Sequence, residues 1–400
     1  MLADLPTLAA PGRAADAQSF QGFVDRVVAP RAAEIDRAGA VPSDLIPALA
    51  AEGYLSAGMA VEHGGGGLDP VRLGILHEEI GRGCSSVRTL LTVHGMVADA
   101  IGRWGTEAQR AELPRFARGE VLGALALSEP AAGSDPGRLE ATAESVSGGY
   151  VLNGNKRWIS MAQIAGVLLV FARTRGGITA FLVPRDTSGL HVVPVDNVLG
   201  TRGGLMGEVW LDDCRLPTGA VLGPVDRGFM TVGAHALEFG RYSVACGCVG
   251  IAQACLDASL EHTAKRWQGG ALIKDHQLIR RLVTDMATET AAARLLCRQA
   301  GALRAGDDLA APLATWMAKY YSAAAANRAA RETVQIHGAA GCLDGHPAAR
   351  FFRDAKVMEI IEGSTEIQQV VIADLARQDQ RRFPKLPDAL TWRGVVSHEH

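Results

Sequence analysis

The first part of the chain spaces its apolar residues as amphipathic helices do. Over 16–37 the apolar residues share one helical face, at Phe20, Phe23, Val24, Val27 and Val28. Ser43 is a candidate N-cap for a second short helix, and the glycines at 64–67 interrupt the pattern. Pro70 begins a further helix, because proline is tolerated in a first helical turn, and 106–118 reads as a last short one. We therefore predict an N-terminal helical domain over residues 1–120.

The pattern changes near residue 121, where short apolar runs alternate with turn signals. Strands are predicted at 167–171, 178–183, 191–195 and 207–211. Turns are predicted at 147–149 and at Asn153-Gly154, because both contain glycine in a favoured hairpin context. Residues 121–225 are therefore predicted to form a β domain between helical ones.

After Gly228 the helical spacing returns and persists. Long helices are predicted over 229–267, 275–304 and 309–336, with shorter ones over 347–360 and 365–375. Helices of this length predict a helical bundle over 226–377. Residues 378–400 are rich in proline and charge and are predicted to be a flexible tail. The fold class is thus mainly α with an inserted β domain.

Composition and charge exclude several classes of function. The chain has 400 residues, 48% of them hydrophobic and 21% charged, with a net charge of -3 and no clustered basic run, which argues against nucleic-acid binding. Its 7 cysteines include no CxxC pair, so we expect no disulfide framework and no metal site, in keeping with a reducing compartment. No signal peptide is recognisable, and the apolar run 166–171 is far too short to span a bilayer. We therefore expect a cytoplasmic protein without a membrane partner.

Two segments of the β domain combine small residues, hydroxyl groups and an aromatic ring. Segment 125–135 (Leu-Ala-Leu-Ser-Glu-Pro-Ala-Ala-Gly-Ser-Asp) allows close backbone approach to a flat ligand, and its serines can hydrogen-bond it. Segment 153–160 offers the flat face of Trp158 and the hydroxyl of Ser160. Taken singly, the first segment is equally a strand followed by a turn, and the second a hairpin with a core tryptophan.

Two segments near the C-terminus carry the other candidates. Segment 335–341 is a small-residue turn at a helix end, where backbone amides can meet a phosphate, although a helix C-cap at Gly338 is commoner. In segment 353–367, Glu362 stands between an apolar run and a glycine. Partial burial there raises the pKa of a carboxylate toward the value that suits a base. A solvated or capping glutamate is the ordinary alternative.

In this order and at these distances, the four segments resemble the acyl-CoA dehydrogenase family over about 20–376. The resemblance implies a helical N-terminal domain, a middle β-barrel-like domain and a C-terminal four-helix bundle. It also implies FAD-dependent oxidation of an acyl thioester between Cα and Cβ, with an electron acceptor that stays unidentified. Glu362 matches the base that removes the α-proton while hydride leaves Cβ for N5 of FAD. Some branches place the base directly before Arg241, where this chain has Gly240.

The resemblance also implies the binding residues. Cofactor positions are Leu125, Leu127, Ser128, Gly133, Ser134, Trp158, Ser160, Arg266, Gln268, Gln335, Gly338, Ser364 and Glu366. Substrate positions are Ser134, Glu238, Arg241 and Gly363. The family's counterparts of Arg266, Gln268 and Gln335 reach the FAD of a neighbouring subunit, so a homo-oligomer, dimer or tetramer, is expected. Two departures are Gly269, where the family usually has Phe, and Met161, which replaces a small polar residue beside the flavin edge.

The sequence leaves the acyl carrier open. Segments 84–89, 240–250 and 359–364 resemble a branch that acts on acyl carrier protein thioesters in polyketide extender-unit biosynthesis, of the hydroxymalonyl or methoxymalonyl type. In that branch the oxidised group can be a C3 aldehyde. We expect this branch, with an ordinary short-chain acyl-CoA dehydrogenase as the alternative. A carrier protein's acidic surface would meet arginines at helical spacing, unless these form only a solvated helix face: Arg280, Arg281, Arg294 and Arg298.

Two further classes remain as alternatives. Flavin oxidases and monooxygenases share the family's architecture, although the monooxygenases generally lack the base that Glu362 would provide. A binding protein that has kept the fold and lost the flavin is the other class, against which Glu362, Trp158, Arg266 and Gln335 argue.

Overall fold

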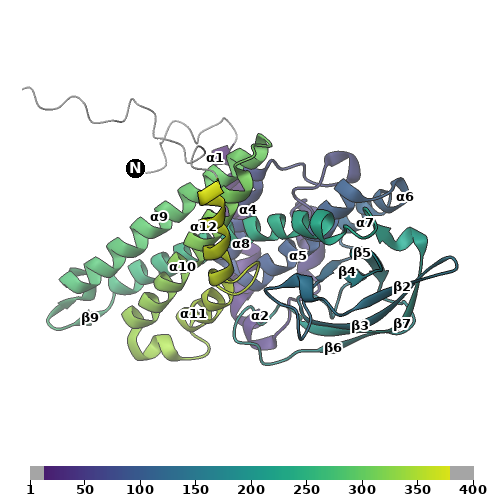
Figure 1. Cartoon of the computed structure of the whole chain (residues 1–400). Helices are drawn as coiled ribbons and strands as arrows, with labels where there is room; N and C mark the ends of the chain where they lie inside the picture. The colour runs from purple at the N-terminus through teal and green to yellow at the C-terminus, as the bar shows by residue number, and fades with distance from the viewer. Residues whose placement is uncertain (1–12, 379–400) are drawn as a thin grey trace, which may run out of the picture.

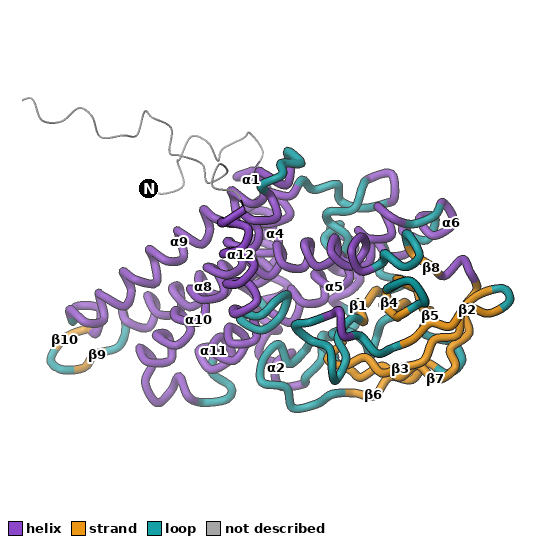
Figure 2. Tube along the Cα trace, in the orientation of Figure 1, coloured by secondary structure: helices purple, strands orange, loops and turns teal. Residues whose placement is uncertain are grey.

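The structure is a computed structural model that describes residues 13–378. Helices and strands separate clearly in space, with the strands gathered at one end and long helices at the other (Figure 1, Figure 2). The order predicted from the sequence, helical then β then helical, is confirmed.

The N-terminal helices contribute to two apolar clusters. These helices are α1 (Arg13–Phe23), α2 (Ala32–Ala38), α3 (Leu45–Ala51), α4 (Pro70–Gly83), α5 (Ser85–Trp104), α6 (Glu107–Arg110) and α7 (Leu113–Ala117). The predicted start at Pro70 is confirmed, and the Asp69 carboxylate caps α4 by accepting two backbone N–H groups. The prediction for Ser43 is wrong. Asp44 stands at the N-cap of α3 without capping it, because its carboxylate pairs with Arg31 instead.

The middle region forms one mixed sheet. Its strands are β1 (Gly123–Ala126), β2 (Thr142–Val146), β3 (Gly149–Ile159), β4 (Val167–Arg173), β5 (Ile178–Pro184), β6 (Leu190–Pro194), β7 (Gly207–Pro217) and β8 (Val221–Leu222). They pair in the order β6-β7-β3-β2-β4-β5-β8, with β1 parallel to β4. The turn predicted at 147–149 joins β2 to β3. The turn predicted at Asn153-Gly154 is wrong, because β3 continues through it and absorbs Gly154 (φ 150°) at an irregularity in its pairing with β7.

The C-terminal helices are α8 (Ala234–Thr263), α9 (Gln277–Ala305), α10 (Ala311–His337), α11 (Pro347–Met358) and α12 (Thr365–Gln378). A short hairpin of β9 (Trp267–Gln268) and β10 (Ala271–Leu272) joins α8 to α9. The stretch Phe229–Thr263 is long and apolar enough to cross a membrane by length and composition. However, 72% of its most apolar 18-residue segment is buried inside the protein. Packing of α8 against α4, α5, α9 and α10 accounts for its apolar sequence.

Polar contacts join the three regions around α11. Arg353 of α11 forms a bidentate ion pair with Asp36 of α2, and the Asp354 carboxylate accepts the backbone N–H of Thr201 at 2.6 Å. The loop before α12 is thereby held where helices from both ends of the chain meet the β domain.

Candidate active site

Glu362 lies on the turn between α11 and α12, which has a left-handed backbone at two successive residues. The φ angle is 56° at Glu362 and 92° at Gly363. A left-handed conformation costs a residue other than glycine about 1–2 kcal/mol, so neighbouring contacts must hold it. Arg241 Nε donates to the Glu362 carbonyl at 3.2 Å, while Lys319 Nζ and Gln368 Nε2 donate to the Gly363 carbonyl at 2.8 and 2.7 Å. These donors fix the direction in which the Glu362 side chain points.

The Glu362 carboxylate lies among buried cations, and none of the described residues forms a direct ion pair with it. Within residues 13–378 its buried Oε2 has no hydrogen-bond partner. Burial raises the pKa of Glu362 to about 7, against the opposing attraction of Arg241, Lys319 and Arg88. A carboxylate in this state is basic enough to accept a proton and still substantially ionised near neutral pH.

Helix α8 presents a glycine to this carboxylate. A Cβ at Gly240 would lie 2.6 Å from Glu362 Oε2, so any side chain there would displace the carboxylate. The next residue, Arg241, pairs with Glu238 and stacks over Trp316, with its guanidinium carbon 3.6 Å from the ring centroid. The structure therefore brings together three residues that the sequence predicted for the site: Glu362, Glu238 and Arg241.

The two segments predicted to contact a flavin lie next to each other at the edge of the sheet. The Arg157 N–H donates to the Ser128 carbonyl at 2.8 Å, which joins the chain after β1 to the end of β3. Trp158 has a left-handed φ of 62°, and its side chain is 53% exposed rather than packed in the core. Ser128 and Ser160 are half-buried nearby.

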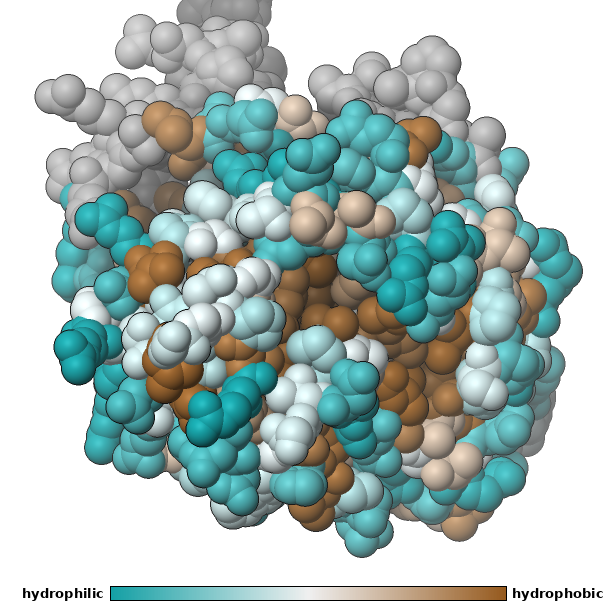
Figure 3. Space-filling view, turned by 90° about the vertical axis from the view of Figure 1, so that its right-hand side faces the viewer, coloured by the Kyte–Doolittle hydropathy of each residue, from teal (hydrophilic) through white to brown (hydrophobic). Residues whose placement is uncertain are grey.

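The surface around Trp158 suits a flat and partly apolar group such as the flavin of FAD. Half-buried Leu125, Leu205 and Leu237 come from the β domain and the start of α8, and all pack on one core. At exposed Gly133 a Cβ would meet nothing within 4 Å, which leaves room for a ligand. Viewed from the β-domain side, the molecule is hollowed, and the floor of the hollow is hydrophobic (Figure 3).

Two of the predicted cofactor positions form hydrogen bonds within the chain itself. The Leu127 side chain is buried in a core cluster, and its carbonyl accepts from Lys156 Nζ at 3.3 Å. Ser364 Oγ accepts the Ile367 N–H at 3.4 Å at the start of α12, where Glu366 is exposed. Met161, one of the two departures from the family, has a fully buried side chain.

Residues predicted to reach FAD from a second subunit lie far from Trp158 of their own chain. Exposed Arg266 and Gln268 stand at the β9–β10 hairpin, at the opposite end of the molecule from the β domain (Figure 1). Gln335 and Gly338 are exposed where α10 ends. Gly269 has a φ of 61° in the hairpin turn, which explains a glycine where the family usually has phenylalanine.

Two of the four arginines considered for a carrier-protein surface on α9 are engaged within the chain. Arg294 and Arg298 both bind the carboxylate of Glu78 on α4, at 2.7 and 2.9 Å. Exposed Arg280 and Arg281 remain at the other end of the helix. The inner pair of arginines therefore holds α9 to α4.

Three residues close to Glu362 or Arg241 carry no motif in the sequence: Lys319, Arg88 and Trp316. Lys319 is fully buried on α10, and burial lowers its pKa to about 8. Arg88 is fully buried on α5. Both interrupt apolar helix faces, and a cation on the buried face of a helix is the signal that could have identified them.

Known protein families match nearly all of the described residues. Three family models match: acyl-CoA dehydrogenase N-terminal domain (14–120), middle domain (124–214) and C-terminal domain (226–376). The chain is 35% identical to human mitochondrial short-chain specific acyl-CoA dehydrogenase, over 89% of this chain and 88% of the relative. It is 36% identical to acryloyl-CoA reductase (NADH) of Anaerotignum propionicum, over 88% and 91%.

A similar solved structure comes from polyketide biosynthesis. FkbI, for biosynthesis of the methoxymalonyl extender unit of the polyketide Fk520, is 36% identical, with a TM-score of 0.84 over 90% of this chain and 99% of that one. The matched domains, their order and these relatives show that the chain belongs to the acyl-CoA dehydrogenase family, a family of FAD-dependent oxidoreductases acting on acyl thioesters.

Proposed function

We propose that the protein dehydrogenates a short-chain acyl group carried as a thioester on coenzyme A. Glu362 is the proposed catalytic base. The observation that carries the proposal is the unpartnered Glu362 Oε2, buried opposite Gly240 and with its pKa raised to about 7. The similarity to a short-chain acyl-CoA dehydrogenase and to an acryloyl-CoA reductase supports a short acyl group on coenzyme A.

In this proposal Glu362 acts on the substrate, and the residues around it hold it in position. Glu362 takes the α-proton, and its left-handed turn keeps the carboxylate facing Gly240. Arg241 holds that turn through the Glu362 carbonyl, and Glu238 and Trp316 hold Arg241. The backbone N–H of Glu362 would stabilise the developing enolate oxygen, a contact worth roughly 3 kcal/mol in a dry site. Trp158, Ser128 and Ser160 would hold the flavin of FAD, which would supply the acceptor for the hydride that leaves Cβ.

Anaerobic bleaching of the flavin tests this proposal. Butyryl-CoA should bleach the wild-type protein, and Glu362→Gln should keep its flavin but lose at least about 1000-fold in reduction rate, because only the proton acceptor is removed. Glu359→Gln, the same change at a carboxylate three residues earlier that pairs with Lys356, serves as the control for disturbance of the fold. Near-normal bleaching of the Glu362→Gln protein would refute the assignment.

An acyl carrier protein substrate is the second candidate, favoured by the 36% identity to FkbI. Against this candidate, Arg294 and Arg298, two of the four arginines expected to meet a carrier protein, are paired with Glu78. The same acyl groups should therefore be offered on coenzyme A and on a carrier protein. Bleaching by the carrier-bound thioesters alone would replace the coenzyme A proposal with this one.

A further inference from the structure

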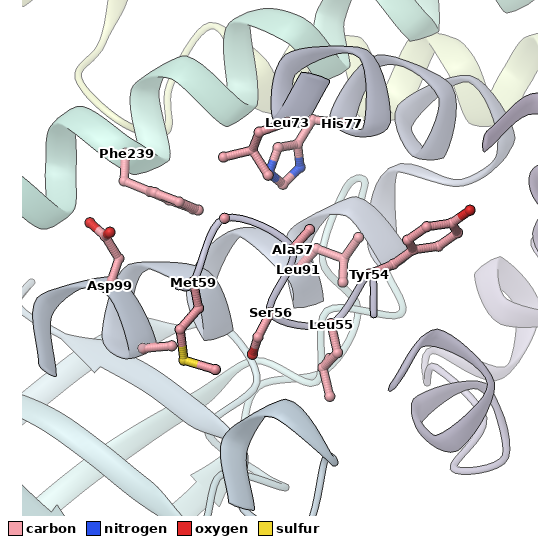
Figure 4. Close-up of a pocket in the computed structure, with 13 residues that line it drawn as sticks. Tyr54, Leu55, Ser56, Ala57, Met59, Leu73, His77, Leu91, Asp99 and Phe239 are labelled. Atoms are coloured by element: carbon pink, nitrogen blue, oxygen red, sulfur yellow. The ribbon is translucent and has the colours of Figure 1, made fainter. Parts of the chain in front are cut away.

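The surface marked by Trp158 is open and is not an enclosed pocket. The structure holds a small cavity elsewhere, between α4, α5 and the loop 54–59, with Phe239 of α8 on one side (Figure 4). None of the predicted cofactor positions lines that cavity. A flavin beside Trp158 therefore depends on surface side chains, so whatever fixes the exposed indole ring contributes to flavin binding.

A β-bulge turns Trp158 toward this open surface. In its pairing with β7, β3 places two residues, Arg157 and Trp158, opposite Glu208 alone. Because of this extra residue, Lys156 before the bulge and Ile159 after it are both almost fully buried. Arg157 and Trp158 are thereby left together on the outside of the strand, with their side chains 41% and 53% exposed.

The Arg157 side chain covers one face of the Trp158 ring. Its guanidinium carbon lies 4.7 Å from the ring centroid, within the range of cation–π attraction. Arg157 Nε is 2.7 Å from Glu208 Oε1, an ion pair whose angles are not those of a hydrogen bond. The Glu208 side chain is only 21% exposed, and the pairing of its backbone with Val193 of β6 keeps it in the sheet. The carboxylate therefore holds the guanidinium, and the guanidinium holds the ring.

We infer that Arg157 is a positioning residue for the flavin: anchored by Glu208, it keeps Trp158 turned outward so that the free face of the ring stays open to the cofactor. The inference rests on the proposed place of FAD beside Trp158. A guanidinium suits this role because its plane can lie against an indole while its edge pairs with a carboxylate. Arg157 thus acts on flavin binding through the ring and not by direct contact.

Release of FAD from the holoenzyme measures this effect. Arg157→Met should speed the release about fivefold, equivalent to about 1 kcal/mol, the usual size of a partly exposed cation–π contact. Arg157→Lys should recover only part of the retention, because a lysine can pair with Glu208 but offers no plane to the ring. Arg103→Met is the matched control, since Arg103 also precedes a tryptophan, with its guanidinium carbon 5.9 Å from that ring. An unchanged release rate in Arg157→Met would overturn the inference.

A double-variant cycle separates positioning of the ring from a general loosening of the fold. Trp158→Ala should speed FAD release and change the visible circular dichroism of the bound flavin, and Arg157→Met should change the dichroism in the same direction. Added to Trp158→Ala, Arg157→Met should alter the release rate by less than about twofold, because Arg157 acts only through the ring. Effects that multiply in the double variant would overturn the inference, since Arg157 would then act independently of Trp158.

A second variant covers a failure of Arg157→Met to fold. Glu208→Gln removes the anchor and leaves Arg157 and Trp158 in place, so it should speed FAD release in the wild-type background and not in Trp158→Ala. Unchanged release in both backgrounds would overturn the inference. Unchanged release and dichroism in Trp158→Ala would refute the place of the flavin beside Trp158, and the inference with it. Bleaching by butyryl-CoA would still support the proposed dehydrogenase in that case, so the two failures can be told apart.

Discussion

Glu362 illustrates how a single carboxylate can be tuned by opposing neighbours. Burial raises its pKa to about 7, while Arg241, Lys319 and Arg88 pull the pKa down. Without these cations the carboxylate would hold its proton well above neutral pH and could not act as a base there. The buried cations thus have an electrostatic role at the site as well as a structural one.

The rate of flavin reduction should therefore depend on pH through this residue. A base acts when it is ionised, so kcat/KM should fall about tenfold per pH unit well below the pKa of Glu362 and level off above pH 7. Anaerobic stopped-flow reduction from about pH 5 to about pH 9 measures this limb. A rate that stays level down to the low end of this range would place the midpoint near the ordinary value of 4.5 and would show that the carboxylate is solvated during catalysis.

Single residues also show how far the sequence can predict a site. Glu362, Glu238 and Arg241 are identifiable from their motifs, and the structure brings them together. Arg88 and Lys319 escaped notice because their importance comes from burial. Whether a cation on a helix reaches solvent depends on which helix packs against it, and Gly240 and Gly247 of α8 create the space that Glu362 and Arg88 fill.

At the scale of elements, local periodicity predicted most helices and strands. It could not predict which distant segments pair with one another. Asn153-Gly154 has the composition of a turn, but β7 pairs with β3 on both sides of it and holds the strand together. Arg294 and Arg298 have the spacing of an exposed face, but Glu78 of α4 lies opposite. In each case a contact between segments far apart in sequence overrides the local signal.

Strand β3 is tied to the chain after β1 by a buried ion pair. Lys156 Nζ lies 2.6 Å from Glu129 Oε1, and both side chains are almost fully buried. The same ammonium donates to the Phe171 carbonyl at 2.5 Å, and Glu129 accepts the backbone N–H of Glu140 and Ala141. The pair therefore supports the segment that carries Ser128 and Gly133.

Lys156→Met should destabilise the protein and weaken flavin retention together. Removing one partner leaves the Glu129 carboxylate buried without its cation, which costs about 3–5 kcal/mol. Lys265→Met is a matched control, because Lys265 and Glu261 form an exposed pair worth under about 1 kcal/mol. Thermal unfolding and flavin content after gel filtration measure both effects. An unchanged melting temperature in Lys156→Met would show that the pair does not support the segment.

At the scale of the whole molecule, the predicted cofactor residues fall into two distant groups. Trp158 and Ser160 lie at the edge of the β domain, whereas Arg266 and Gln268 lie at the far end of the helical bundle (Figure 1). One FAD cannot reach both groups of the same chain. If both bind FAD, a neighbouring chain must supply the second group, and the protein must be a homo-oligomer.

Co-expression of two inactive chains tests this arrangement directly. In a mixed oligomer of Glu362→Gln and Arg266→Glu chains, a shared site can combine the intact Glu362 of one chain with the intact Arg266 of the other. Activity should therefore reappear in the mixed protein although each variant alone is nearly inactive, because charge-assisted contacts to a pyrophosphate are lost in the second variant. If Arg266 instead served its own chain, every site in the mixture would keep one lesion, and activity would stay at the level of the parents. Differently tagged chains purified in tandem would show that the mixed oligomer had formed, so that a lack of recovery would count against the shared site rather than against assembly.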